Sequence, residues 1–320
     1  MDLKFRITLL LCLLNFSINF AQTRHTLSGT ITDQNTNETL IGVTVSVKEA
    51  NISTITNEYG FYSVSVPEGE YTLEVSYIGF YVFSERISVK GNTRKSIAMQ
   101  TSDVMIEGIE ITGSSRATNI RKPEMSVNKL SVEEIKKMPV VLGEVDILKS
   151  ILTLPGVTNA GEGASGFNVR GGAADQNLIL LDEAIMYSSS HLFGFFSVFN
   201  SDAIKDLKLY KGGIPSRFGG RVSSVLDIYQ KEGNSKEFHG TGGIGLISSR
   251  LMLEGPIVED KVSFLVAGRS SYAHLFLKFT DNENSAYFYD LNTKINYKIN
   301  ENNNLYLSGY FGRDVFDIQN

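Results

Sequence analysis

The side chains that could do chemistry are few in this sequence of 320 residues. The four histidines show no spacing typical of metal ligands, and they are His25, His191, His239 and His274. The single cysteine, Cys12, lies in an amino-terminal apolar run, and neither Ser216 nor Ser223 has an identifiable base that would activate a nucleophile. We therefore expect no enzyme activity and no bound cofactor or metal.

One glycine cluster imitates a nucleotide-binding loop. Gly161, Gly163 and Gly166 fit the pattern G-x-G-x-x-G, and Asp182 follows near the distance of a ribose-binding acid. Such a loop must follow a strand and open a helix, whereas Pro155 and its neighbouring glycine precede this one. The context argues against dinucleotide binding.

Composition narrows the class of protein further. The 30 Lys and Arg residues against 35 Asp and Glu give a net charge of -5, with no basic block for nucleic acid. Hydrophobic residues at 42% and charged residues at 20% exclude general disorder. The 29 Gly, 19 Phe and 14 Tyr favour β-structure with many turns.

The amino terminus predicts export. Lys4 and Arg6 precede an apolar run over residues 7–14, and the sequence then softens to Ala21. This pattern is typical of a secretory signal at residues 1–21, since a membrane-spanning helix needs about 20 apolar residues. The exported chain would hold no cysteine, which excludes a disulfide-stapled module.

Residues 22–100 form the first block of alternating apolar and polar sequence. About seven short strands with frequent turns predict an antiparallel β-sandwich. The block resembles the carboxypeptidase-regulatory-like domain, a transthyretin/Ig-like sandwich at the front of outer-membrane receptors of Bacteroidetes-type bacteria. The residues that carry this resemblance are Gly29, Asp33, Gly42, Val43, Val45, Gly60, Phe61, Tyr62, Pro67, Gly69, Tyr71 and Gly79.

Residues 101–122 are expected to be a linker that contains one short strand. Its apolar and acidic residues alternate over Met105, Ile106, Glu107, Gly108, Ile109, Glu110, Ile111 and Thr112. A strand with nothing nearby to pair with offers an edge that another chain can extend. The segment resembles the TonB box of TonB-dependent receptors, which binds a periplasmic energising partner; an ordinary linker is the alternative.

Residues 123–232 form a mixed α+β block. A capping box predicts a helix over residues 132–137, apolar spacing predicts another over 145–152, and a third helix is expected to start at Ser201 or Asp202. Strands are expected at residues 166–170, 178–181, 207–210 and 222–228.

An ordered set of motifs in this block resembles the plug domain of TonB-dependent receptors. The motif residues singled out are Asn168, Arg170, Gly171, Gly172, Arg217 and Arg221. In the family the arginine of N-x-R-G pairs with carboxylates of the surrounding barrel, which implies that role for Arg170, with Arg217 or Arg221 as a second candidate. A surface arginine in a glycine loop is the alternative. The sequence after Asp182 departs from many relatives, which carry a glycine there.

Residues 233–320 alternate as the strands of a membrane barrel do. Over residues 287–299 one face is apolar and aromatic, while the other carries Asp290, Lys294 and Lys298. An apolar face toward lipid and a polar face toward a wet lumen is what such a barrel requires. Strands are expected at 236–246, 248–254, 261–272, 285–299 and 304–316, with turns at 255–260 and 300–303.

The length of this last block is short for a whole barrel. Transporters with a filled lumen have about 22 strands, and strands of about 9 to 11 residues would need roughly 200 residues or more. Residues 233–320 suffice for about five strands, so we expect a fragment of a longer receptor or a truncated gene.

The hypothesis is a TonB-dependent outer-membrane receptor that takes up a scarce or bulky ligand, with its sandwich in the periplasm. Siderophore, cobalamin, oligosaccharide and peptide stay open as ligands. The partners implied are the TonB energising complex, outer-membrane lipid and the unknown ligand; a surface lipoprotein lid is also allowed. The alternative is an exported β-rich adhesin or polysaccharide-binding module without transport activity.

Overall fold

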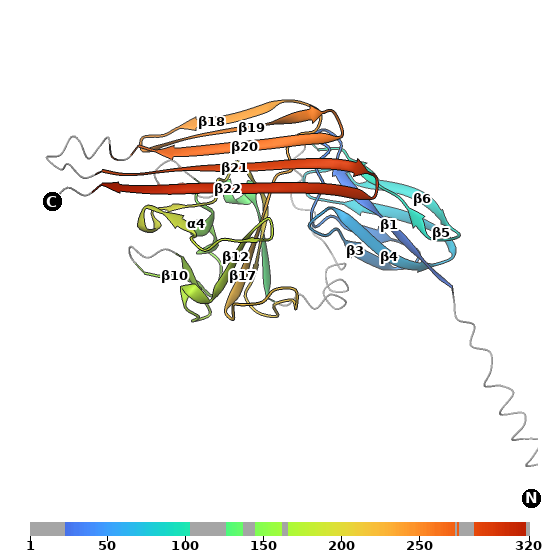
Figure 1. Ribbon diagram of the computed structural model, residues 1–320. Coiled ribbons are helices and arrows are strands. Elements are labelled where there is room, and N and C mark those ends of the chain that lie inside the picture. Colours follow the sequence, from blue (N-terminus) through green and yellow to red (C-terminus); the bar gives the residue numbers. More distant parts are fainter. Residues whose placement is uncertain are drawn as a thin grey trace, which may run out of the picture.

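The computed structural model describes residues 23–102, 126–136, 145–161, 166–272, 274 and 285–317. Three parts follow one another along the chain: a front β-sandwich, a middle α+β domain and a five-stranded antiparallel sheet (Figure 1). The predicted signal and the candidate TonB box lie outside the described residues. In the part of the chain that is described, no helix has the length and apolarity to cross a membrane.

The front domain is the predicted sandwich of two sheets. One sheet has the order β3-β2-β5-β6, and the other has β4-β1-β7 with β8 also paired to β1. The strands are β1 (Arg24–Asp33), β2 (Thr44–Val47), β3 (Ile52–Ile55), β4 (Phe61–Pro67), β5 (Gly69–Ser76), β6 (Phe83–Val89), β7 (Thr93–Arg94) and β8 (Ile97–Met99).

Period-two sequence explains the core of the sandwich. In β4 the side chains of Tyr62, Val64 and Val66 are buried, and the residues between them are exposed. The turn before β4 closes at Gly60, where φ is +67° and a Cβ would clash with the carbonyl oxygen of Ile31. Only glycine fits both conditions, so this turn approaches the β1 backbone closely.

The middle domain is built on a sheet of order β13-β12-β17-β16-β9. Strands β12 and β17 run parallel, and the other neighbours run antiparallel. Its elements are β9 (Val127–Ser131), α3 (Val132–Lys136), α4 (Ile147–Ile151), β10 (Val157–Asn159), β11 (Phe167–Val169), η1 (Ala174–Gln176), β12 (Asn177–Leu181), β13 (Ala184–Ile185), β14 (Ser190–His191), η2 (Leu192–Gly194), β15 (Phe196–Ser197), β16 (Ile204–Tyr210) and β17 (Ser224–Gln230).

Two of the three helices predicted in this domain are present. Helix α3 begins at Val132 as expected, and α4 begins after Asp146, whose side chain accepts the backbone N–H of Lys149. The helix predicted to start at Ser201 or Asp202 is wrong, because a turn there leads directly into β16. Isoleucines of both helices pack with buried residues of β16 and β17 in one core.

The last part is an antiparallel sheet of order β18-β19-β20-β21-β22. Its strands are β18 (His239–Ile244), β19 (Ser248–Val258), β20 (Val262–Ser271), β21 (Ser285–Asn300) and β22 (Asn303–Asp317). Five strands were predicted, but the turn at 255–260 is partly wrong. Strand β19 continues through Pro256, and an irregularity in register before Val258 accommodates the missing N–H.

The two faces of β21 differ as the sequence predicts. Phe288, Asp290 and Lys294 are buried, whereas Leu291 and Ile295 on the opposite face are exposed. The buried face lies against the middle domain, which sits beneath the sheet (Figure 1). The exposed face is apolar at these positions.

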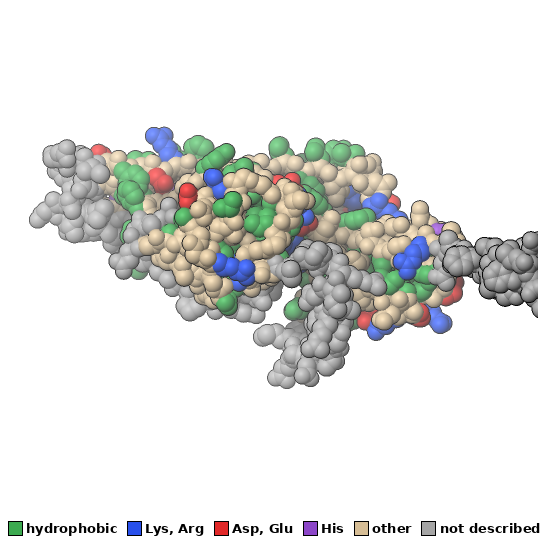
Figure 2. Space-filling model, turned by 90° about the horizontal axis from the view of Figure 1, so that it is seen from below, with side chains coloured by type: hydrophobic (Ala, Val, Ile, Leu, Met, Phe, Trp, Pro, Cys, Tyr) green, Lys and Arg blue, Asp and Glu red, His purple; other side chains and the backbone are tan. Residues whose placement is uncertain are grey.

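The front domain lies at the end of the sheet where β21 turns into β22 (Figure 1). We call this the inner end, and it holds the short turns 259–261 and 301–302. The opposite, outer end holds the last residues of β20 and β22. Seen from below, the surface carries charged side chains of both signs scattered among uncharged ones (Figure 2).

Candidate functional site

The middle domain is bound to the sheet through a buried ion pair. Arg269 of β20 and Asp290 of β21 face each other in register, and their closest atoms, Nη2 and Oδ2, are 2.5 Å apart. Both side chains are almost fully buried. Arg269 also donates to the backbone oxygen of Ser197 at 2.7 Å, so the sheet arginine contacts the middle domain directly.

His191 extends this contact on the middle-domain side. Its Nε2 lies 3.3 Å from Asp290 Oδ2, and its Nδ1 lies 3.0 Å from Asp314 Oδ1. The imidazole stacks on Phe288, with ring centroids 4.3 Å apart, and Tyr310 lies 3.1 Å from Nε2. One middle-domain histidine thus contacts both β21 and β22.

Two further pairs cross the same interface. Asp202 binds Arg250 of β19 at 2.7 Å, although sequence reasoning had placed Asp202 at a helix start. Asp182 accepts Lys294 of β21 at 3.1 Å and Ser308 of β22 at 2.5 Å. Buried charges are tolerated when paired and hydrogen-bonded, so these contacts align the middle domain against the sheet.

The turn that carries Asp182 shows how the departure from the family pattern is accommodated. Asp182 and Glu183 have φ of +46° and +69°, and they join β12 to β13 as a two-residue turn. Asp182 accepts the backbone N–H of Gln230 at 2.9 Å, and its other contacts reach the sheet. These contacts offset the cost of a non-glycine residue in the left-handed region.

The N-x-R-G motif forms a tight turn after β11. Gly171 has a φ of +82°, and a Cβ on Gly172 would clash with Ser223. Half-buried Asn168 lies in β11, while Arg170 is exposed and donates to Ser126 Oγ at 2.9 Å. Within the described residues no carboxylate contacts Arg170, so its pairing with a barrel carboxylate stays a prediction.

The other two arginines of the motif set lie apart from Arg170. Arg221 is exposed on the loop before β17. Arg217, also exposed, binds Glu58 of the front domain at 3.1 Å. The structure therefore brings Arg217 to the front domain rather than to the sheet.

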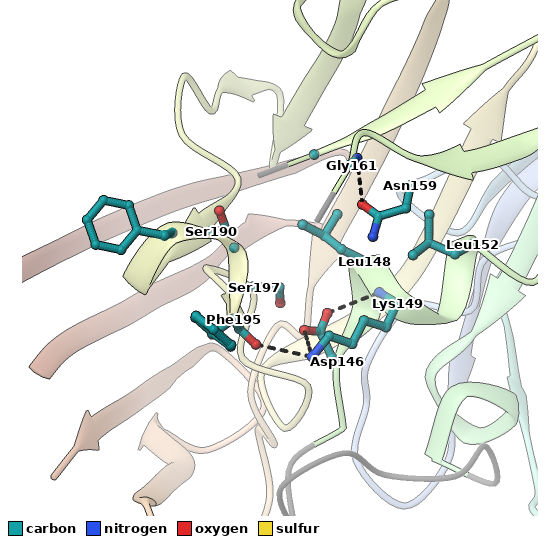
Figure 3. A pocket seen from close by; sticks show the side chains of 12 residues that line it. Asp146, Leu148, Lys149, Leu152, Asn159, Gly161, Ser190, Phe195 and Ser197 are labelled. Atoms are coloured by element: carbon teal, nitrogen blue, oxygen red, sulfur yellow. Dashed lines mark hydrogen bonds and ion pairs between the residues drawn. The ribbon is translucent and has the colours of Figure 1, made fainter. Parts of the chain in front are cut away.

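A pocket lies between α4 and the loop after β14 (Figure 3). Its volume is about 120 Å³, and its lining includes the exposed ring of Phe193. Lys149 crosses one side of the pocket, 3.7 Å from Asp146 and 3.1 Å from the backbone oxygen of Phe195 (Figure 3). A cation, an anion and an exposed aromatic ring give this pocket the means to bind a polar ligand.

Asp227 is the titratable group of the middle domain with the most perturbed environment. It is fully buried in β17; Tyr229 donates to its Oδ2 at 2.8 Å, and its Oδ1 has no partner. Burial raises the pKa of Asp227 to about 6, against the opposing effects of the Tyr229 hydrogen bond and the Lys208 charge. Within the described residues no cluster of His, Cys, Asp or Glu could hold a metal ion.

Sequence reasoning missed the residues at the centre of this interface. Arg269 and Asp290 fall on the polar face of predicted strands, so their alternation was the available signal. His191 carried no signal, because its partners are more than 90 residues away in sequence and meet it only through the fold.

Comparison with known families assigns the first two parts of the chain. Residues 27–111 match the CarboxypepD_reg-like domain, and residues 119–224 match the TonB-dependent receptor plug domain. The first match extends into the predicted linker at 101–122, and the second begins within it. No match is found among curated proteins.

Solved structures of similar fold are outer-membrane receptors. The siderophore receptor PirA from Acinetobacter baumannii is 18% identical, with a TM-score of 0.46 over 60% of this chain and 32% of that one. A mutant of the ferric enterobactin receptor PfeA from Pseudomonas aeruginosa is 18% identical, with a TM-score of 0.46 over 64% and 35%. The copper transporter OprC is 13% identical, with a TM-score of 0.42 over 59% and 30%. The chain spans about a third of the length of these proteins.

Proposed function

The chain carries the plug domain of the TonB-dependent receptors behind a CarboxypepD_reg-like domain, and from this premise we propose that it works as an outer-membrane receptor for TonB-dependent uptake. The observation that carries the proposal is the plug match at residues 119–224, joined to a sheet whose polar face binds that domain. The exposed face of β21, with Leu291 and Ile295, suits contact with lipid.

In this proposal the sheet belongs to a barrel wall and the middle domain is the plug in its lumen. The ligand binds at the outer end, where the pocket beside Phe193 opens. A periplasmic partner pairs with residues 105–112 and pulls on the plug. The front sandwich lies in the periplasm, because it sits at the inner end of the sheet.

The ligand is a scarce or bulky solute that diffusion through an open pore would not supply. Siderophores, cobalamin, oligosaccharides and peptides form the panel to test. Cells that lack other receptors should grow on one member of this panel only when the intact receptor and the TonB complex are both present. Growth that is unchanged in cells without TonB would refute active uptake.

The energising contact is testable without a known ligand. Partner recognition by strand addition depends on backbone N–H and C=O groups, so Ile111→Val should leave binding of the periplasmic TonB domain unchanged. Ile109→Pro removes a donor and resists pairing in a ladder, so it should abolish that binding. Equal binding by both variants of the intact receptor in detergent would show that residues 105–112 are only a linker.

A further inference from the structure

The front domain is bound to the plug by a carboxylate that two cations share. Glu58 lies in the turn between β3 and β4, and its Oε1 is 2.8 Å from Lys208 Nζ and 3.1 Å from Arg217 Nη2. The side chains of Glu58 and Lys208 are 13% and 6% exposed. Burial opposes ionisation of Glu58, but the two cations outweigh it and lower its pKa to about 2. The carboxylate is therefore charged at any physiological pH.

Neighbouring residues extend this plug-side contact. The Tyr59 hydroxyl donates to Glu183 at 2.5 Å. Thr39 donates its hydroxyl to Glu232, and Lys205 lies 3.2 Å from both of these side chains. Thr39 and Glu232 are each only 4% exposed, so this part of the contact is closed to solvent.

The same front domain also contacts the inner turns of the sheet. Arg94 binds the side chain of Asn302 and, at 2.5 Å, the backbone oxygen of Glu301. Asn37 donates to Asp260 at 3.4 Å. The backbone N–H of Ser235 donates to Thr36 at 3.1 Å, in the segment that leads from the plug to β18. These contacts involve different front-domain residues from those that bind the plug.

We propose that the front sandwich is a clasp that joins the inner end of the plug to the inner turns of the sheet. Its plug side is Glu58 and Tyr59, and its sheet side is Thr36, Asn37 and Arg94. Because one domain makes both sets of contacts, the plug cannot move relative to the wall at this end until one set breaks. The clasp rests on the proposed function only for its role in uptake; the docking itself stands on the contacts.

The clasp also has a place in the pulling step. The chain leaves the front domain near residue 102 and enters the plug at β9, and the candidate TonB box lies between them. A partner that pulls on this segment therefore pulls on the clasp and on the plug together. Release of the clasp would precede rearrangement of the plug.

Docking can be tested by cysteine cross-linking in the intact receptor. Thr36 and Ser235 share a backbone hydrogen bond, which is compatible with the Cα separation of about 4.4 to 6.8 Å that a disulfide needs. The chain beyond residue 21 has no cysteine of its own. The pair Thr36→Cys and Ser235→Cys should cross-link in outer membranes under mild oxidation, and neither single variant should.

Charge reversal then tests whether Glu58 holds the clasp. Glu58→Arg should lower the cross-linking yield and raise amide hydrogen exchange both in β16 and at the turn 301–302, by roughly tenfold or more. The matched control is Glu68→Arg, an exposed glutamate in the turn at the far end of β4, which should change neither readout. Lys208→Met removes the partner from the plug side and should reproduce the effect of Glu58→Arg, even if Glu58→Arg fails to fold.

Several outcomes would overturn the clasp. Absence of the cross-link would mean that the front domain is not docked. Unchanged cross-linking in both Glu58→Arg and Lys208→Met, or increased exchange confined to the front domain, would mean that it does not hold the plug. Neither readout uses a ligand or the TonB complex, so failure of the growth panel would refute uptake and leave the clasp standing.

Discussion

Removing Arg269 should loosen the plug more than any other single change in the sheet. In Arg269→Met the Asp290 carboxylate stays buried without its arginine, and the backbone oxygen of Ser197 loses a donor. Breaking a buried pair from one side costs about 3 to 5 kcal/mol. At about 1.4 kcal/mol per tenfold change, the plug segment around Ser197 should open roughly a hundredfold to a few thousandfold more often.

The assay is amide hydrogen exchange of residues 189–199 in the intact receptor in detergent. The double variant Arg269→Met with Asp290→Leu removes both charges, so it should recover most of the loss and leave about 1 to 3 kcal/mol for the unsatisfied oxygen of Ser197. Lys298→Met changes an exposed lysine of β21 and serves as the control. Exchange in β20 shows whether the sheet itself is intact.

The reasoning would be refuted by equal exchange in the single and double variants. That result would mean that the cost lies in lost packing and not in an uncompensated charge. Exchange in Arg269→Met that matches Lys298→Met would refute it as well, because the pair would then contribute nothing to holding the plug.

The remaining predictions concern the lipid face and pH. Ile295→Arg places a charge on the exposed face of β21 and should cost about 2 to 4 kcal/mol of unfolding free energy, whereas lumen-facing Asn296→Arg should cost less; equal shifts in a urea titration in lipid would mean that the two faces are assigned wrongly. Asp227, with a pKa of about 6, is raised in part by Glu58, so undocking lowers that pKa, the docked state binds the proton more tightly, and docking should strengthen as pH falls from 7.5 to 5. Below about 4.5 the effect reverses, because Glu58, with its docked pKa of about 2, must be protonated on undocking. Fluorescence energy transfer between dyes on the front domain and the sheet, followed through urea at pH 5 and 7.5, measures this, and Asp227→Asn should remove the difference.

Local sequence pattern was sufficient for much of the fold. The alternation around Asp290 identified the buried face of β21, and the turn before Gly60 was readable from its residues. Where local signals conflicted with tertiary contacts, the prediction failed. Asp202 looks like a helix cap in sequence, but its carboxylate binds Arg250 of the sheet. Pro256 looks like a turn residue, but strand β19 runs through it.

The functional contacts were harder to predict, for a physical reason. Arg217 was singled out as a possible partner of the barrel, yet it binds Glu58, which precedes it by 159 residues. Nothing in the local pattern around Glu58 distinguishes it from Glu68, and only the docking of two domains gives it two cationic partners. Arg170 keeps its predicted role untested, because its contact in the described residues is Ser126.

Strand β9 gives the plug a direction of mechanical weakness. It is an edge strand of five residues, paired only with β16, and the segment that the energising partner would grip leads into its first residue. A load along the axis of β9 shears its rungs together, whereas a load across the axis peels them one at a time at much lower force. The angle at which the partner pulls therefore decides whether the plug yields strand by strand, beginning with β9, or resists as a block.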